Sequence, residues 1–363
     1  MIDRRHLSQI DFFLVAVTFS LAVIGLFNIY SATRLEDTPF YAKQLTWFII
    51  GLIVSLPLIL ISYSTIEKFA YHIYGISIAS LVLVLIAGTR IAGAKRWLSL
   101  GFMNIQPSEL AKIALIIALA AYLSKKKADR WGLGIRELII PGLIFIVPFL
   151  LIAKQPDLGT GLILAAIAVS MILIVRVTWV ALILTCVSMA AFIPFAWRFL
   201  KDYQKARLLS FIDPSMDPLG SGYHTFQSKI AIGSGGFTGK GYLQGTQGSL
   251  YFLPEHHTDF VFPVFAEEWG FLGAIVVMFL FMVLILRGID IANKSKDRFG
   301  FLLAFGFTAL IFWHVTMNAF MVIGFLPVVG VPMPFLSYGG SFLLSTMIAI
   351  ALLINIHMRR FMF

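Results

Sequence analysis

Long apolar runs recur along the whole chain and are separated by short polar connectors. Each run extends over roughly 17 to 25 residues, enough for an α-helix to cross the hydrocarbon core of a membrane, which is about 30 Å thick. A transmembrane β-barrel would instead show alternating segments of about ten residues. The pattern predicts an all-α polytopic membrane protein with about ten transmembrane helices, near residues 11–32, 43–62, 70–88, 107–123, 138–153, 158–175, 178–197, 260–286, 300–325 and 336–357.

The first apolar run, from Asp11 to Tyr30, follows Arg4 and Arg5 as the apolar part of a signal peptide would. It is about twenty residues long and many further runs follow, so we interpret it as an uncleaved first span. The single cysteine, Cys186, lies in an apolar run. It leaves no basis for a disulfide framework or a cysteine-based metal site.

Composition agrees with a membrane protein. Hydrophobic residues make up 59% of the 363 residues and charged residues only 13%, far from the usage of soluble domains. The net charge is +10, but the basic residues fall in short connectors and do not form one face. Anionic lipid headgroups or a phosphate-bearing substrate are therefore the expected partners, and a nucleic acid is not.

The basic residues also predict the orientation. With the N-terminus in the cytoplasm, roughly 15 Lys and Arg lie on the inner side and about six on the outer side. Residues 1–363 then form one domain with both termini cytoplasmic, and residues 198–258 form a large extracytoplasmic loop between helices seven and eight. Loops of this length are generally functional or disordered. Here "KDYQKARLLSFIDP" is typical of a short interfacial helix, and "GSGGFTGKGYLQGTQG" is rich in glycine.

The stretch "LPEHHTDFVF" places Asp259 at the edge of a long apolar run. We expect Thr258 to cap the helix and Asp259 to lie in its first turn. From this position alone, Asp259 is equally explained as an ordinary acidic residue at a helix N-terminus and as a functional residue. Glu267 and Glu268 would then lie roughly 12 Å deeper, where carboxylates must face protein or water. This predicts a polar cavity with Asp259 at its mouth, or else a buried ion pair. Pro263 favours a bent helix entrance.

Other connectors carry charges that can serve an anionic substrate. Glu109 and Lys112 are spaced i, i+3 in "NIQPSELAK" and can form an ion pair, and Lys112 can also act as a counter-charge in the cavity. Lys154 and Asp157 border the turn "KQPDLGTG", for which a tight polar turn is a sufficient explanation.

An expected outer loop, "GTRIAGAKRWLSLG", carries Arg90, Lys95 and Arg96 against the trend for basic residues to lie inside. Phosphate binding and contact of a surface hairpin with headgroups explain this equally well. "EHHTD" lacks the helical spacing of a zinc protease, although His256 or His257 with Asp259 offers ligands for a divalent ion.

Five segments resemble, in order and spacing, the SEDS family of bacterial cell-wall proteins (shape, elongation, division and sporulation). They are "QPSELAK", "KQPDLGT", "GKGYLQGTQGSLYFLPEHHTDFVF", "AEEWGFLG" and "GFLPVVGVPMPFLSYGGSFLL". The third is more similar to the elongation members than to the division members, although His256 and Pro263 depart from the usual residues. The resemblance implies a ten-helix peptidoglycan glycosyltransferase of the bacterial cytoplasmic membrane, which polymerises lipid II at the outer face beside a class B penicillin-binding protein, a transpeptidase.

The resemblance also implies roles for residues. The family's catalytic aspartate corresponds to Asp259, expected to take the proton of the acceptor sugar's 4-hydroxyl as a β-1,4 link forms. Cations, or a bound magnesium or manganese ion, would stabilise the pyrophosphate leaving group. Neighbouring cations would keep Asp259 ionised and weakly basic. The candidates for substrate contacts are Lys112 first, then Arg90, Lys95, Arg96, Lys154, Glu109, Asp157, His257, Glu267 and Glu268.

Two other functions fit the sequence. A lipid II flippase would use the same cavity, and His314 and Asn318, one turn apart, would extend a path inward, although hydrogen bonds between helices are their commoner use. A non-catalytic scaffold of the elongation complex would leave Asp259 dispensable. The loop 198–258 is expected to act as a lid, and the segment "PVVGVPMPFLSYGG" to pack beneath the site.

Overall fold

The structure is a computed structural model that describes residues 9–360, except 92–93, 100, 102–103, 127–131, 200, 214–219, 249–252 and 254. Eight described helices are long and apolar enough to cross a membrane: α2 (Phe12–Thr33), α3 (Phe40–Leu60), α5 (Ala70–Ala87), α6 (Pro107–Lys125), α7 (Ile135–Lys154), α12 (Val261–Asn293), α13 (Arg298–Val322) and α14 (Gly340–Met358). Two further apolar helices are α8 (Leu158–Leu173) and α9 (Trp179–Phe199). Each predicted run overlaps one of these helices, and the protein is an all-α polytopic membrane protein with eight to ten candidate spans.

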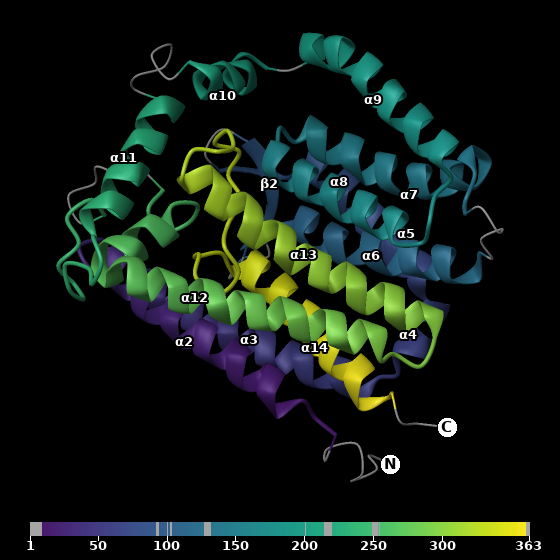
Figure 1. The fold of residues 1–363 in the computed structure, drawn as a ribbon, viewed down its shortest axis with the longest axis horizontal. Coiled ribbons are helices and arrows are strands. Elements are labelled where there is room, and N and C mark those ends of the chain that lie inside the picture. The colour runs from purple at the N-terminus through teal and green to yellow at the C-terminus, as the bar shows by residue number, and fades with distance from the viewer. Residues whose placement is uncertain are drawn as a thin grey trace.

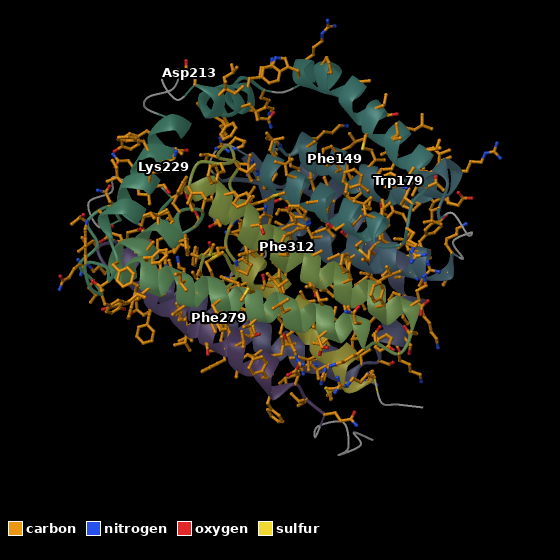
Figure 2. The ribbon with its side chains drawn as sticks, viewed as in Figure 1. Phe149, Trp179, Asp213, Lys229, Phe279 and Phe312 are labelled. Carbon is orange, nitrogen blue, oxygen red and sulfur yellow. The ribbon has the colours of Figure 1, made fainter. Side chains whose placement is uncertain are left out.

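The long helices form a bundle in which α6, α13 and α14 are central (Figure 1). In the most apolar window of α14, 89% of the residues are buried, against 17% in α3. The peripheral helices present large apolar side chains outward, such as Phe279 of α12 and Trp179 of α9 (Figure 2). Such a surface is unfavourable in water but suits contact with lipid chains.

Carboxylates cap several helices, because the first amides of a helix have no partner within it. Asp11 accepts a hydrogen bond of 3.1 Å from the amide of Leu14 at the start of α2 and pairs with Arg287 of α12 at 2.6 Å. Asp297 accepts one of 2.7 Å from the amide of Gly300 in α13. The same side chains that begin the helices therefore also tie neighbouring helices together.

The connectors contain more structure than the sequence predicted. Strands β1 (Thr89–Ile91), β2 (Ala94–Ser99) and β3 (Asn104–Ile105) form an antiparallel sheet in the order β1-β2-β3. α4 (Tyr63–Lys68) is a short helix between α3 and α5. Within 198–258, α10 (Asp202–Ile212) matches the expected short helix, whereas α11 (Ser221–Ser234) was not foreseen.

The helix α12 is broken, but at Gly270 and not at Pro263. Gly270 has φ 66° and ψ −164°, and a β-carbon there would lie 2.3 Å from the amide nitrogen of Gly239, so this position requires glycine. Pro263 lies in the first turn, where no amide partner is lost. The break lies beyond Glu267 and Glu268, which stay on the first helical segment of α12, so their depth below Asp259 stays a prediction.

The start of α12 also differs from the prediction. The helix begins at Val261, so Asp259 lies in the preceding turn and not in the first helical turn. Thr258 does not cap the helix, because its hydroxyl bonds Glu255, at 3.3 Å from the carbonyl and 3.1 Å from the carboxylate.

Candidate functional site

The turn that carries Asp259 is held from three directions, by α13, by α2 and by the amide of Tyr338, which donates to the carbonyl of His257. Asn318 of α13 donates hydrogen bonds to the carbonyls of Asp259 at 2.8 Å and Val331 at 2.7 Å. Asn28 of α2 donates one of 3.1 Å to the carbonyl of Val261. The backbone of this turn is therefore fixed by buried amide side chains, which limits the positions that the carboxylate of Asp259 can take.

The segment 327–339, between α13 and α14, packs beneath this turn, as the sequence predicted. Its apolar side chains are buried, including Val331, Met333, Phe335 and Leu336. Gly330 has φ +74°, and a β-carbon there would lie 3.2 Å from Oδ2 of Asp259. On the other side, a β-carbon on Gly159 would lie 2.5 Å from the carbonyl oxygen of Val329. Glycine thus allows the carboxylate of Asp259 to rest on backbone.

Two of the sequence candidates, Arg96 and Asp157, lie close enough to influence Asp259. Asp157 caps α8, where its carboxylate accepts 3.0 Å from Gln106 and 2.9 Å from the hydroxyl of Thr160. Arg96 of β2 lies 3.8 Å from the carboxylate of Asp157 and donates to the carbonyl of Gln155 at 3.1 Å. The β-sheet therefore positions Arg96 next to Asp157, which caps the start of α8.

The pKa of Asp259 is raised to about 7, chiefly by burial. The charges of Glu255 and Asp157 contribute to this rise, and those of Arg207 and Arg96 oppose it without overcoming the burial. Although the side chain keeps some contact with solvent, its surroundings replace most of the water that would stabilise the anion. The expectation that neighbouring cations keep Asp259 weakly basic is therefore wrong.

A small cationic pocket lies between α10, α11 and the start of the 327–339 segment, and the charge of one of its lining residues, Arg207, acts on Asp259. It has a volume of about 140 Å³ and is lined by Arg207, Ser210, Phe211, Gly222, Thr225, Phe226, Lys229, Gly324, Pro327 and Val328. Sequence reasoning missed Arg207 and Lys229. The basic residues of "KDYQKARLL" could have indicated a binding role for Arg207, but they are equally typical of an interfacial helix that contacts lipid headgroups.

Lys112 is fully buried and its ammonium is already engaged. It lies 2.9 Å from the carboxylate of Glu109 and 2.8 Å from Nε2 of His314, with the ring of Phe342 at 5.4 Å. Glu109 also accepts a hydrogen bond of 2.9 Å from Ser345 of α14. The predicted ion pair thus forms as part of a network that joins three central helices, so we do not assign Lys112 to the substrate.

His314 and Asn318 belong to the same interior. His314 lies 3.1 Å from the carbonyl of Pro332 through Nδ1, one helical turn below Asn318, or roughly 6 Å along the axis. Both side chains therefore connect α13 to the 327–339 segment. Their contacts are those of helix packing and do not favour an inward transport path.

For the remaining basic candidates, the described residues show no contact with Asp259. Arg90 lies in β1, where its backbone pairs with that of Lys95 in β2, and its side chain is outside the described part. Lys154 is exposed at the end of α7. Within the part of the chain that the structure describes, Arg96 is the basic residue of these two connectors whose charge acts on Asp259.

Glu267 and Glu268 anchor the glycine-rich loop. Glu267 pairs with Lys240 at 2.5 Å and accepts from the amide of Thr246 at 2.9 Å. Glu268 accepts a hydrogen bond from the hydroxyl of Ser31, and its carbonyl accepts from the amide of Gly241 at 3.0 Å. The buried ion pair considered from the sequence therefore forms with the loop, and not with a neighbouring span.

His256 and His257 precede Asp259 but face Glu36, in the connection between α2 and α3. Nε2 of His256 lies 3.0 Å from Oε1 of Glu36, and Nδ1 of His257 lies 3.7 Å from the same oxygen. The expected combination of a histidine with Asp259 is thus replaced by one with Glu36. Burial, and then the charge of His256, lower the pKa of His257.

Comparisons with known proteins agree with this architecture. A family model described as a cell cycle protein family, of FtsW, RodA and SpoVE, matches residues 9–361. The peptidoglycan glycosyltransferase MrdB of Escherichia coli K12 is 40% identical over 359 residues, which cover 99% of this chain and 95% of that protein.

Solved structures are also similar over nearly their whole length. A chain from a peptidoglycan synthase complex, studied for the coordination of polymerization and crosslinking, has a TM-score of 0.84 at 31% identity, and the match covers 98% of this chain and 99% of that one. The rod shape determining protein RodA of Thermus thermophilus has a TM-score of 0.73 at 27% identity over 98% of each chain. The protein therefore belongs to the cell cycle protein family of FtsW, RodA and SpoVE, the SEDS family that its motifs resemble.

Proposed function

We propose that this peptidoglycan glycosyltransferase polymerises lipid II into β-1,4-linked glycan strands with Asp259 as the general base. The observation that carries the proposal is the placement of Asp259, a carboxylate with a pKa of about 7 on a fixed turn, within reach of the charge of Arg207, which lines a cationic pocket. Titratable groups with shifted pKa values at a cleft are typical of catalytic sites.

The raised pKa suits the proton transfer. A general base is most effective when its pKa lies near the working pH, since it is then both deprotonated and basic. In the proposed step, Asp259 takes the proton of the 4-hydroxyl of the acceptor sugar. That oxygen attacks the anomeric carbon of the donor, the bond from this carbon to the pyrophosphate oxygen breaks, and the anomeric configuration inverts.

Arg207, Lys229 and Arg96 are the proposed stabilisers of the leaving group. The pyrophosphate gains negative charge as its bond to the sugar breaks, and fixed cations stabilise that charge. The pocket of about 140 Å³ corresponds to the volume of only a few water molecules. It is suited to one charged group of the substrate, while the sugars lie outside it.

The orientation and the biological role are part of the proposal. The bias of basic residues supports an extracytoplasmic position for Asp259 and the 198–258 segment. The motif resemblance and the similarity to a rod shape determining protein support a role in cell elongation. The similarity to a chain of a complex for polymerization and crosslinking supports a transpeptidase partner, a class B penicillin-binding protein.

The test is glycan polymerisation by the purified full-length protein from lipid II, with and without the transpeptidase. Asp259→Asn keeps the shape of the side chain and removes the base, and Asp37→Asn, at an exposed carboxylate in the connection between α2 and α3, is the matched control. We expect Asp259→Asn to lower the rate by at least a hundredfold and Asp37→Asn to leave it unchanged.

Other results would change the assignment. Polymer formation that survives Asp259→Asn would move the base to another residue. Absence of polymer from the native complex, with transfer of labelled lipid II across vesicle membranes, would favour a flippase. Absence of both activities would leave the scaffold role.

A further inference from the structure

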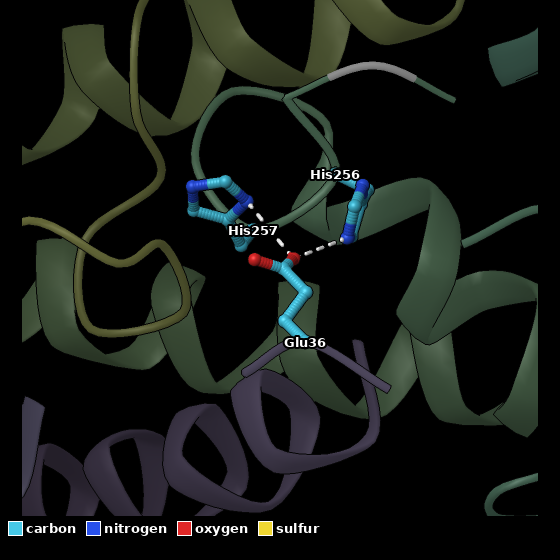
Figure 3. Close-up of side chains that lie close together, drawn as sticks. All are labelled: Glu36, His256 and His257. Carbon is cyan, nitrogen blue, oxygen red and sulfur yellow. Dashed lines mark hydrogen bonds and ion pairs between the residues drawn. The ribbon is translucent and has the colours of Figure 1, made fainter. Parts of the chain in front are cut away.

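We propose that Glu36, His256 and His257 form a binding site for one divalent transition-metal ion of the zinc class. The three side chains converge from two connections that are distant in sequence (Figure 3). Glu36 lies between α2 and α3, and the two histidines lie in the turn before α12. The site is separate from the carboxylate of Asp259 and does not depend on the proposed reaction.

The distances between the ligand atoms of the three side chains are short enough for one small ion to bind all three. One ligand atom from each residue lies within 4.8 Å of the others, and the two shortest separations are 3.0 and 3.7 Å. Ligand atoms about 2.0 Å from a tetrahedral zinc ion are roughly 3.3 Å apart. Small side-chain rotations are therefore sufficient, without movement of the backbone.

The proton positions at His256 point to a cation. Nδ1 of His256 lies 3.0 Å from the carbonyl of Leu253, which can only accept, so Nδ1 carries a proton. With no second proton on the ring, Nε2 would turn its lone pair toward the carboxylate of Glu36, which is repulsive. A metal ion between the two groups removes the repulsion, and a ring nitrogen held by a carbonyl is the usual support of a metal-bound histidine.

His257 presents a second nitrogen to the same oxygen. Nδ1 of His257 is buried and has no hydrogen-bond partner within the part of the chain that the structure describes. Its ring is oriented by stacking on Phe40, with centroids 4.5 Å apart. A proton on Nε2 of His256 would donate a hydrogen bond to Glu36 but leave Nδ1 of His257 without a partner. One metal ion would bind all three side chains.

The donor set selects the kind of ion. Magnesium and calcium prefer oxygen ligands, whereas imidazole nitrogen suits zinc and its neighbours. Two histidines and one carboxylate leave a fourth position for water, as in open zinc sites. The side chains of His257 and Glu36 keep exposures of 20% and 19%, which leaves the site accessible to an ion.

The site would hold the turn of Asp259 from a fourth direction. His257 is two residues before Asp259, and its carbonyl accepts a hydrogen bond of 2.8 Å from the amide of Tyr338. A bound ion would link this turn to the connection between α2 and α3. Because the ligands converge only in the folded chain, binding should also stabilise the fold.

The experiment measures metal binding by the full-length protein in detergent, without lipid II, after removal of any polyhistidine tag and of bound metal with EDTA. Zinc is titrated against a chromophoric chelator, and cobalt is used to record the visible spectrum of the site. Glu36→Gln and His257→Gln remove one ligand each. His72→Gln, at an exposed histidine of α5, is the matched control.

We expect the native protein and His72→Gln to bind one zinc ion per chain and to show the cobalt spectrum of a site with nitrogen ligands. Loss of supporting groups around metal ligands costs about 10 to 100-fold in affinity, so loss of a ligand should cost at least a hundredfold. The metal-free forms of all four proteins should have the same unfolding temperature, and zinc should raise it only for the native protein and His72→Gln.

The proposal is overturned if the native protein takes up no stoichiometric zinc, which would leave His256 and Glu36 as an ordinary ion pair. It is also overturned if Glu36→Gln and His257→Gln bind zinc as tightly as the native chain. Competition by magnesium at equal concentration would contradict the nitrogen ligands.

Discussion

Asp259 combines two properties that usually conflict in a carboxylate. Its backbone is fixed by Asn318, and its side chain rests on Gly330, yet its ionised form is poorly solvated. Sequence patterns identified this residue from the change between polar and apolar positions. They did not give its pKa, because burial depends on segments that are distant in sequence, such as 327–339 and α10.

The rate of polymerisation is expected to follow the ionisation of Asp259. With a pKa of about 7, the base is mostly protonated below neutral pH and mostly ionised above it. The value of kcat/KM should therefore rise with pH through about 7 and then level off. A profile that is already level at pH 5 would show that a group with an ordinary carboxyl pKa is the base.

Stability should change in the opposite direction. The folded protein binds the proton of Asp259 more tightly than the unfolded chain, whose Asp titrates near 3.9. The stability that protonation contributes is therefore present at low pH and is lost as pH rises through about 7. Asp259→Asn should unfold at the same temperature as the native protein near pH 4 and at a higher temperature at pH 8. At pH 8 the free energy of unfolding of the variant should exceed that of the native protein by up to about 4 kcal/mol. Both proteins are measured in EDTA, and equal stability at pH 8 would contradict the raised pKa.

Lys112 is expected to matter for stability. Lys112→Met leaves the carboxylate of Glu109 buried without its partner, which costs about 3 to 5 kcal/mol. The double variant with Glu109→Gln should recover much of this loss. Lys125→Met is the control, since Lys125 is on the same helix but is exposed and lies 3.9 Å from Glu67. Thermal unfolding in detergent measures all three, and an unchanged unfolding temperature for Lys112→Met would contradict the buried network.

Among the elements, the apolar helices were predictable and the junctions between them were not. Runs of about twenty apolar residues define spans whatever their neighbours are. In contrast, "AEEWGFLG" reads as uninterrupted helix, and the break at Gly270 follows from a contact with residues 237–239. The β-sheet was missed for a similar reason, since its strands are only two to six residues long.

Gly330→Ala tests how the 327–339 segment supports the site. The new methyl group would lie 3.2 Å from Oδ2 of Asp259 at a positive φ, so the carboxylate must move. Displacements of about 1 Å at a reacting group can cost a hundredfold in rate, and we expect kcat to fall at least tenfold with little change in KM. Gly142→Ala in α7 is the control, because no atom lies within 4 Å of its added methyl group. A native kcat for Gly330→Ala would show that the carboxylate acts from another position.

At the scale of the whole molecule, apolar residues lie both in the centre of the helix bundle and on its outer surface. Composition alone was sufficient to predict this arrangement. Within the polar interior, the pair of Glu109 and Lys112 was predictable from its spacing in one helix. The contacts with His314 and Ser345 were not, because these residues come from two other helices.

The orientation in the membrane has a direct test. In a Cys186→Ala background, Lys229→Cys on α11 and Lys125→Cys at the end of α6 place one exposed thiol at each of two positions. A thiol reagent that does not cross membranes should label Lys229→Cys in intact cells, and Lys125→Cys only after the cells are opened. The reverse result would place Asp259 on the cytoplasmic side and remove the proposed access to lipid II.

The contacts of Glu267, Glu268 and Gly270 also limit how this protein can be recombined with its relatives. The loop from Gly235 to Gln247 contacts the first part of α12, as far as Leu272. A chimera that exchanges the loop alone would bring foreign side chains against Glu267 and foreign backbone against Gly270. The smallest segment that can be exchanged as a unit is therefore residues 235–272, which ends inside α12 and not at either end of that helix.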